Sequence, residues 1–197
     1  MLPTLIISTS SRKNSNSLRV ARYLQQLCQQ ENATTQIVDF ENYDIPNVGR
    51  GSIQKEKLTT FQAELIEKWH KAQVIIWVLP EYNWSTNAEV INLFHQIASK
   101  DFSYLLDNKI FALVGVSAGR GGRIPCLDIT TVLNKVISFS NKFSVISPRL
   151  LESHETDQNL DEQGNSLGNS LYETTAQSFV KYTYTLAQKW NFEEVLA

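Results

Sequence analysis

Two unbroken apolar runs constrain the fold of this chain more than any other feature of its sequence. They cover Val74–Leu79 and Ile110–Val116, and neither alternates with polar residues. A strand with one solvated face alternates, whereas a continuous apolar run is typical of a strand that is buried on both faces. Such strands belong to parallel sheets, because crossover helices cover both faces. The two runs therefore predict a parallel α/β domain.

The remaining patterns supply the other strands and helices. Short apolar runs predict strands near Leu5–Ile7, Gln36–Phe40 and Phe143–Ile146, and the third strand extends back to Ala72. Helical spacing predicts helices over Leu18–Leu27, Phe61–Trp69, Ala88–Ala98, Ile129–Ile137 and Leu171–Trp190. Polar segments at Asn42–Ser52 and His154–Asn169 are interpreted as surface loops. Five strands alternating with helices indicate a doubly wound α/β fold, and 197 residues suit one domain over 1–197.

Charge and hydropathy exclude several classes of protein. The chain carries 18 Lys and Arg against 20 Asp and Glu, a net charge of −2 without long single-sign runs. Binding of duplex nucleic acid requires a basic footprint, so nucleic acid is not an expected partner. The longest apolar run is far shorter than the roughly 20 residues of a membrane-spanning helix, and the amino-terminal segment does not resemble a signal peptide. We therefore expect a cytoplasmic protein without a membrane partner.

The cysteines and histidines form no pattern that indicates a metal site or a disulfide framework. Cys28 and Cys126 are far apart in sequence. Cys126 is expected near the start of the fourth helix, where a helix N-terminus could lower a thiol pKa, but a buried and inert cysteine is the favoured interpretation. His70, His95 and His154 lack the mutual spacing of zinc ligands, so no metal is expected.

The loop after the first strand, Ser8–Ser17, consists almost entirely of hydroxyl and amide side chains together with Arg12. In open parallel sheets the ligand crevice lies at the carboxyl ends of the strands, so the loops after the first, third and fourth strands meet there. Backbone N–H groups at the helix start, serine hydroxyls and the Arg12 guanidinium would together bind a phosphate. Ordinary helix capping and turn formation explain the same residues equally well, and both interpretations stay open. The loop lacks the glycine motifs of classical dinucleotide folds and of P-loop nucleotidases.

The other two loops differ in character from the first. Pro80–Ser85 carries aromatic side chains, and Ser117–Arg123 is rich in glycine. Such a pair suits a flat heterocycle, which needs an aromatic surface, backbone donors and little side-chain bulk. Taken alone, Ser117–Gly122 is also explained as a flexible turn before a helix. The convergence of three such loops at one crevice favours a binding site.

Three segments, Ile6–Leu18, Pro80–Asn83 and Val114–Gly122, resemble the phosphate loop, the isoalloxazine loop and the third flavin loop of a known family. That family is the NAD(P)H-dependent FMN reductases of the flavodoxin-like superfamily, with azoreductase-like, quinone-reductase-like and chromate-reductase-like members. Pro-Glu-Tyr-Asn directly after a buried strand is the most specific of the three signals. The match in element order extends to about Leu151. The resemblance implies a flavodoxin-like, five-stranded sheet of order 2-1-3-4-5.

The resemblance also implies roles for individual residues. The FMN phosphate would be held by Ser10, Arg12, Ser15, Asn16 and Ser17. The isoalloxazine would be contacted by Pro80, Glu81, Tyr82 and Asn83, and the ring or ribityl chain by Ser117, Ala118 and Gly119. Arg120 and Arg123 are candidates for the NADPH phosphates. The implied reaction is hydride transfer from NAD(P)H to FMN and then to a free flavin, quinone, azo dye or metal oxyanion, with no catalytic side chain required. A homodimer, or a tetramer, is the assembly expected from the resemblance.

The chain departs from the family pattern at several positions. Trp84 stands where the family has Gly, Asn87 and Ala88 replace a Pro-Gly pair, and Thr9 stands where Gly is usual. Trp84 could stack on flavin or nicotinamide, or fill the pocket and exclude FMN. A Trp at a position of positive φ would also strain the turn. These departures support an alternative, a non-catalytic flavodoxin-like binding module. An electron-carrier flavodoxin is a weaker alternative, because such carriers are strongly acidic.

Overall fold

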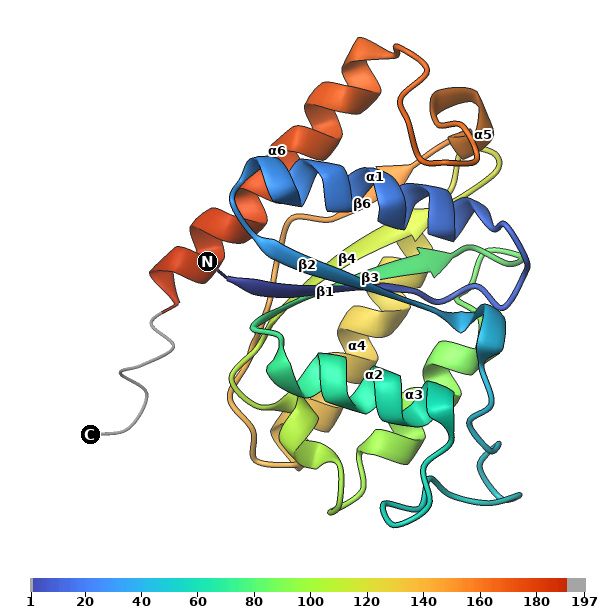
Figure 1. The fold of residues 1–197 in the computed structure, drawn as a ribbon, viewed down its shortest axis with the longest axis vertical. Coiled ribbons are helices and arrows are strands. Elements are labelled where there is room, and N and C mark those ends of the chain that lie inside the picture. Colours follow the sequence, from blue (N-terminus) through green and yellow to red (C-terminus); the bar gives the residue numbers. More distant parts are fainter. Residues whose placement is uncertain (1, 191–197) are drawn as a thin grey trace.

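A parallel sheet forms the centre of the molecule, with its strands in the order β2-β1-β3-β4-β5 and with β6 also paired to β4 (Figure 1). The computed structural model describes residues 2–190, so residues 1 and 191–197 of the expected 1–197 domain lie outside the described range. The strands are β1 (Pro3–Ser8), β2 (Thr34–Asp39), β3 (Val74–Pro80), β4 (Ile110–Val116), β5 (Val145–Ile146) and β6 (Leu151–Ser153). The expected order 2-1-3-4-5 is confirmed.

Helices cover both faces of this sheet, as the unbroken apolar runs predict. One face packs against α1 (Asn16–Gln30) and α6 (Ser170–Lys189). The other face packs against α2 (Thr60–Lys71), α3 (Ala88–Ile97) and α4 (Arg123–Phe139). Every residue of β3 and β4 is buried. Alternate side chains of each strand therefore enter two separate cores, and only apolar residues fit both.

The fifth strand differs from the expectation. The strand predicted at Phe143–Ile146 is shorter in the structure, with β5 pairing only the start of β4 and β6 pairing its end. Phe143 is exposed and lies outside the strand. Pro148 lies between the two pieces and has no N–H for the ladder, so the chain leaves the sheet there and returns at Leu151.

Other boundaries also shift. The second strand ends at Asp39, because Phe40 begins a 3-10 turn, η1 (Phe40–Asn42). A further short turn, η2 (Ser103–Leu106), precedes β4. The fourth helix begins at Arg123, slightly before Cys126, which was expected near its start, and it follows Gly122 with φ +107°. The interpretation of His154–Asn169 as a surface loop is wrong in part, because α5 (Thr156–Asn159) lies within it and Leu160 is fully buried.

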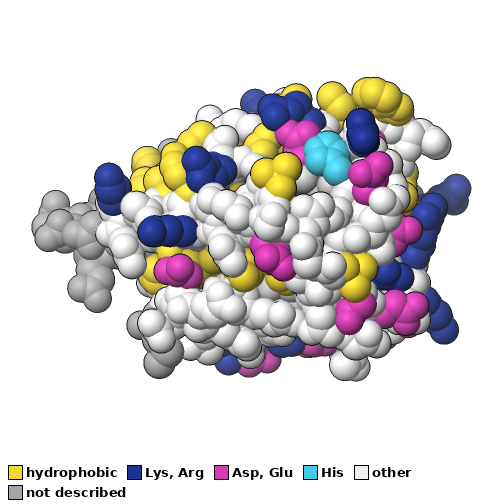
Figure 2. All heavy atoms as spheres, turned by 90° about the horizontal axis from the view of Figure 1, so that it is seen from above, with side chains coloured by type: hydrophobic (Ala, Val, Ile, Leu, Met, Phe, Trp, Pro, Cys, Tyr) yellow, Lys and Arg dark blue, Asp and Glu magenta, His cyan; other side chains and the backbone are white. Residues whose placement is uncertain are grey.

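Both cysteines are buried packing residues, as the favoured interpretation predicts. Burial raises the pKa of Cys28 to about 11 and that of Cys126 to about 12. Within residues 2–190, no helix is both long and apolar enough to cross a bilayer. In the same range, no three His, Cys, Asp and Glu side chains gather as metal ligands would. On the face shown in Figure 2, basic and acidic side chains are interspersed, so that face carries no continuous basic stripe.

Candidate functional site

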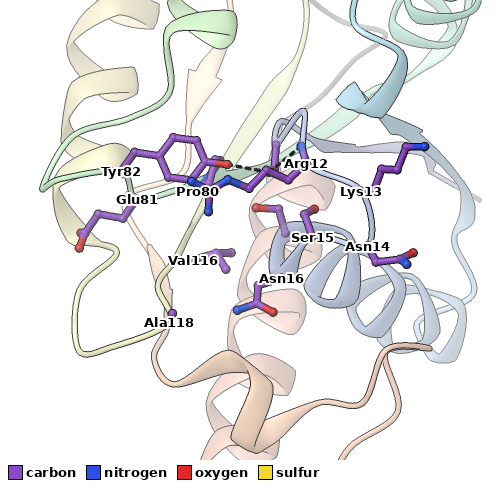
Figure 3. Close-up of a pocket in the computed structure, with 12 residues that line it drawn as sticks. Arg12, Lys13, Asn14, Ser15, Asn16, Pro80, Glu81, Tyr82, Val116 and Ala118 are labelled. Carbon is purple, nitrogen blue, oxygen red and sulfur yellow. Dashed lines mark hydrogen bonds between the residues drawn. The ribbon is translucent and has the colours of Figure 1, made fainter.

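The ends of three strands lie level at one edge of the sheet. Ser8 at the end of β1 pairs with Val78, and Pro80 at the end of β3 pairs with Val116 at the end of β4. The following loops surround a cavity of about 280 Å³ (Figure 3). The cavity is lined by Ser10, Arg12, Lys13, Asn14, Ser15, Asn16, Ser17, Pro80, Glu81, Tyr82, Val116 and Ala118.

Most of the residues expected from the sequence lie around this cavity. The loop after β1 contributes all of its expected members, and the other two loops contribute Pro80, Glu81, Tyr82 and Ala118. The structure does not bring Asn83, Trp84, Ser117, Gly119 or Arg120 to the cavity wall. Three lining residues were missed, namely Lys13, Asn14 and Val116. Their place in the sequence could have indicated them, because Lys13 and Asn14 belong to the same polar loop and Val116 ends the fourth strand.

The N-terminus of α1 opens into the cavity. The serine-rich loop that leads to it shows features of both helix capping and anion binding. Ser15 is the N-cap of α1, and its Oγ accepts a hydrogen bond from Leu18 N at 3.1 Å. The hydroxyl of Ser17 is 1% exposed and has no hydrogen-bond partner among the described residues. A buried hydroxyl without a partner is unfavourable in the free protein. Together with the positive end of the helix dipole, these hydroxyls form a site that suits an anion.

Tyr82 crosses from the loop after β3 to the loop after β1. Its hydroxyl lies 2.8 Å from Ser10 Oγ, and the Arg12 guanidinium carbon lies 4.4 Å from its ring centroid. Figure 3 shows the Tyr82 ring and the Arg12 side chain on the same side of the cavity. The tyrosine therefore presents an aromatic face in the cavity wall next to a cation.

Glu81 connects the second loop to the third. Its Oε2 accepts a hydrogen bond from Gly122 N at 2.5 Å, and its backbone N–H donates to Val116 O at 2.8 Å. A Cβ atom on Gly121 would clash with the Glu81 carboxylate, and one on Gly115 would clash with the backbone of Gly122. The glycines of the third loop therefore allow the close approach that fixes its position beside the cavity.

Trp84 does not fill the cavity. Tyr82 and Ser85 exchange backbone hydrogen bonds of 2.9 and 3.1 Å, and the two residues between them, Asn83 and Trp84, have φ of +51° and +65°. Positive φ at both central positions is what a type I′ turn requires. Asp128 Oδ2 accepts from Ser85 Oγ and Thr86 N, which anchors the turn to α4. Trp84 is 76% exposed, so the expected strain of the turn is present, and of the two alternatives for its side chain the structure does not show the one in which it fills the cavity.

The two arginines considered for NADPH already face carboxylates. Arg120 Nε lies 3.6 Å from Glu155 Oε1, and Arg123 pairs with Glu152 at 2.5 Å. Arg120 is largely exposed, with 85% of its side chain accessible. Such exposed pairs are weak and exchange partners easily.

Comparison with known proteins identifies the family. The model of a family described as NADPH-dependent FMN reductase matches residues 3–147, which include all three loops around the cavity. The chain belongs to this family. Among curated protein sequences, none matches the chain.

Solved structures show the same fold as this FMN reductase family member at low sequence identity. The flavoenzyme NAD(P)H:(acceptor) oxidoreductase FerB from Paracoccus denitrificans has a TM-score of 0.74 at 16% identity, covering 95% of this chain and 98% of that one. The apo form of an NADH:FMN oxidoreductase has a TM-score of 0.62 at 12% identity, covering 94% and 90%. A flavodoxin from the domain Archaea has a TM-score of 0.54 at 12% identity, covering 95% and 98%. The fold is flavodoxin-like.

Proposed function

We propose that this chain is an FMN-dependent NAD(P)H oxidoreductase, in which hydride passes from NAD(P)H to FMN held at the cavity and then to a small-molecule acceptor such as a flavin, quinone or azo compound. The observation that carries the proposal is the pairing of an anion site with an aromatic wall. The unpartnered Ser17 hydroxyl and the N-terminus of α1 lie at the same cavity as the Tyr82 ring. A phosphorylated heterocycle needs both features.

The residues of the first loop would hold the phosphate. Ser15 and Ser17 each have a hydroxyl proton that none of their observed bonds uses, and Arg12 adds a charged donor. The side chain of Asn16 reaches the cavity beside them. Ser10 acts differently, because its hydroxyl is paired with Tyr82 and orients that ring.

The other two loops would hold the ring system. Pro80 and Tyr82 provide apolar and aromatic surface, while Glu81 fixes the glycine loop that brings Ala118 to the wall. Asn83, Trp84, Ser117, Gly119 and Arg120 remain proposed contacts of the ring, the ribityl chain or the nicotinamide at the rim. The cavity volume is at the lower end of the range for small-molecule sites, so the ring would stay partly open to a second substrate.

Bound FMN would supply the redox chemistry at this site, because its ring accepts a hydride and passes electrons on. The protein's own contribution is to bind and orient the cofactor, and no acid or base is needed for hydride transfer. Two proteins of the same fold, an NAD(P)H:(acceptor) oxidoreductase and an NADH:FMN oxidoreductase, support this proposal. A cytoplasmic homodimer remains part of the proposal through the family resemblance alone.

The position of Trp84 gives no support to the alternative of a non-catalytic binding module. That alternative depended on Trp84 closing the flavin site, and Trp84 instead lies on an exposed turn outside the cavity wall. It also rested on Asn87 and Ala88 in place of the family's Pro-Gly pair. Asn87 is buried, and its side chain is hydrogen-bonded to Thr9 and Glu89, which indicates a specific structural role.

The first test is FMN binding by the purified protein. We expect oxidised-flavin absorption bands, or saturable changes in these bands when FMN is titrated into the apo protein, together with FMN-dependent oxidation of NADH or NADPH. Arg12→Ala should weaken FMN binding at least about tenfold, the effect of losing one charge-assisted hydrogen bond. Arg22→Ala is the matched control, because Arg22 lies on α1 and donates to Glu162 O, away from the cavity wall. A wild-type protein that neither binds FMN nor oxidises NAD(P)H with it would contradict the proposal.

A further inference from the structure

The first turn of α3 is bonded to the polar loop that follows β1. Asn87 Nδ2 donates to Thr9 O at 2.7 Å and to Glu89 Oε2 at 2.9 Å. Glu89 Oε1 in turn accepts from Ser11 Oγ at 2.8 Å. We call Asn87 and Glu89 the α3 clamp. The clamp joins two segments separated by 78 residues and holds the residues on either side of Ser10.

Asn87 makes these bonds instead of the local bond that its position favours. It is the N-cap residue of α3, but its side chain accepts no hydrogen bond from the helix. Asn is among the preferred N-cap residues, because its side chain normally satisfies a free N–H of the first turn. Here the residue is 2% exposed, and its side-chain amide donates to Thr9 O in the loop and to Glu89 Oε2 in α3. Asn87 therefore links the loop to the first turn of α3 instead of capping that helix.

Glu89 makes the second half of the clamp charge-assisted. Burial alone would raise the pKa of this carboxyl, but hydrogen bonds from Ser11 and Asn87 outweigh burial and the pKa is lowered. Glu89 is thus ionised at neutral pH, and ionised acceptors form stronger hydrogen bonds than neutral ones. Its charge also lies in the first turn of α3, where the helix dipole favours an anion.

Two departures from the family pattern meet in this contact. Thr9 and Asn87 occupy positions where Gly and Pro are usual, and Thr9 Oγ1 lies 3.3 Å from Asn87 Oδ1 and 3.1 Å from Val78 O. Neither a glycine nor a proline side chain could form any of these hydrogen bonds. The departures therefore complement each other, and they act on the loop that leads to Arg12 and to the N-terminus of α1.

We propose that Asn87 and Glu89 are positioning residues that hold this loop in its binding shape and thereby set the preference of the cavity for a phosphorylated flavin over riboflavin. The inference rests on the proposed function, because it assumes that the loop receives the FMN phosphate. A loop that is ordered during folding does not have to be ordered again on binding, so its affinity for the anion is higher. The effect is expected to be larger at the phosphate end, because the side-chain hydrogen bonds of the clamp reach Thr9 and Ser11 directly, whereas Tyr82 is reached only through Ser10.

The test compares two asparagines on the same helix. Asn87→Ala removes the Asn87 half of the clamp, whereas Asn92→Ala removes part-buried and exposed bonds, to Tyr43 Oη, Pro46 O and Val48 N, from a different loop. Dissociation constants for FMN and for riboflavin are measured by quenching of flavin fluorescence. We expect Asn87→Ala to weaken FMN binding about tenfold or more and riboflavin binding less than threefold, in line with the loss of a net buried hydrogen bond or two. Asn92→Ala should lower the stability but leave the ratio of the two constants unchanged.

Two further variants keep the test informative if Asn87→Ala does not fold. Thr9→Val and Glu89→Gln each weaken one side of the clamp with little change in volume, and Thr9→Ser should restore the wild-type ratio. Amide hydrogen exchange without flavin provides a second readout, with faster exchange at residues 9–13 in the clamp variants only. If the wild type binds FMN and the clamp variants keep its FMN-to-riboflavin ratio, the inference is wrong and the proposed function stands. If the wild type binds neither flavin, the proposed function fails, and the inference fails with it.

Discussion

Ser17→Ala should make the free protein more stable and its binding of FMN weaker. Ser17 lies in the first turn of α1 at 1% exposure, with no partner for its hydroxyl among the described residues. A buried hydroxyl without a hydrogen bond is unfavourable by about 1–3 kcal/mol, and alanine is the better helix former by a few tenths of a kcal/mol. Because a small packing loss offsets part of this gain, we expect about 1 kcal/mol of added stability. That corresponds to a rise in Tm of about 2–4 °C for a chain of this size.

The same substitution removes a donor that the proposed phosphate would accept from. A hydrogen bond to a charged group contributes about 1.5–3 kcal/mol, so the Kd for FMN should rise about 10- to 100-fold. Urea unfolding of the apo protein and flavin titration measure the two effects separately. Ser140→Ala is the matched control, because Ser140 also has a buried, unpartnered hydroxyl but follows the C-terminus of α4, a helix length of about 25 Å from the cavity. A Ser17→Ala protein that is less stable, or that binds FMN as the wild type does, would refute the reasoning.

Three other substitutions have expected outcomes. Trp84→Gly should raise the stability by about 1 kcal/mol, because it relieves a left-handed conformation without removing a buried side chain, and an unchanged or lower Tm would contradict this. Glu81→Ala should lower the stability by about 1–2 kcal/mol and weaken FMN binding, because Gly122 N loses its acceptor. A variant with wild-type Tm and FMN affinity would show that the third loop keeps its shape without Glu81. Lys109 is buried, and burial lowers its pKa to about 8. Between pH 8 and about 10 this side chain therefore binds more protons in the unfolded chain than in the folded one, so its contribution to stability rises with pH in that range. The free energy of urea unfolding of the wild type minus that of Lys109→Met should therefore increase over this range by at most about 1.4 kcal/mol per pH unit, and a constant difference would count against the lowered pKa.

The sheet could be predicted because its central strands, β3 and β4, are buried on both faces. No polar residue therefore interrupts either apolar run, and an unbroken run indicates a strand that is covered on both sides. The position of the cavity followed from the same condition, since helices on both faces imply parallel strands and parallel strands place their following loops at one edge. The convergence of the three loops thus needed no knowledge of any individual contact.

The edge of the sheet could not be predicted in the same way. Residues of β5 are only half-buried, and β6 has three residues, so neither piece carries a distinctive apolar pattern. Their places depend on β4, which is long enough to pair with one piece at its start and the other at its end. The first residue of α4 could not be predicted for a related reason. Gly122 sits at the N-cap with positive φ and no side chain, so the usual Ser, Thr, Asp or Asn signal is absent.

The departures in the second loop show why a substitution cannot be interpreted from its own position. Trp84 in place of Gly suggested a closed cavity, but the type I′ turn that holds its backbone directs the side chain to solvent, and the local hydrogen bonds of Tyr82 and Ser85 fix that turn. Asn87 in place of Pro was one of the departures that supported the binding-module alternative, yet its partner is Thr9, another departure, far away in the sequence. Each of these residues is unexpected singly, whereas together they form a satisfied buried contact. The loop after β1 in this chain therefore makes a polar contact across two loops, where the family's usual Gly and Pro offer no side chains to form one.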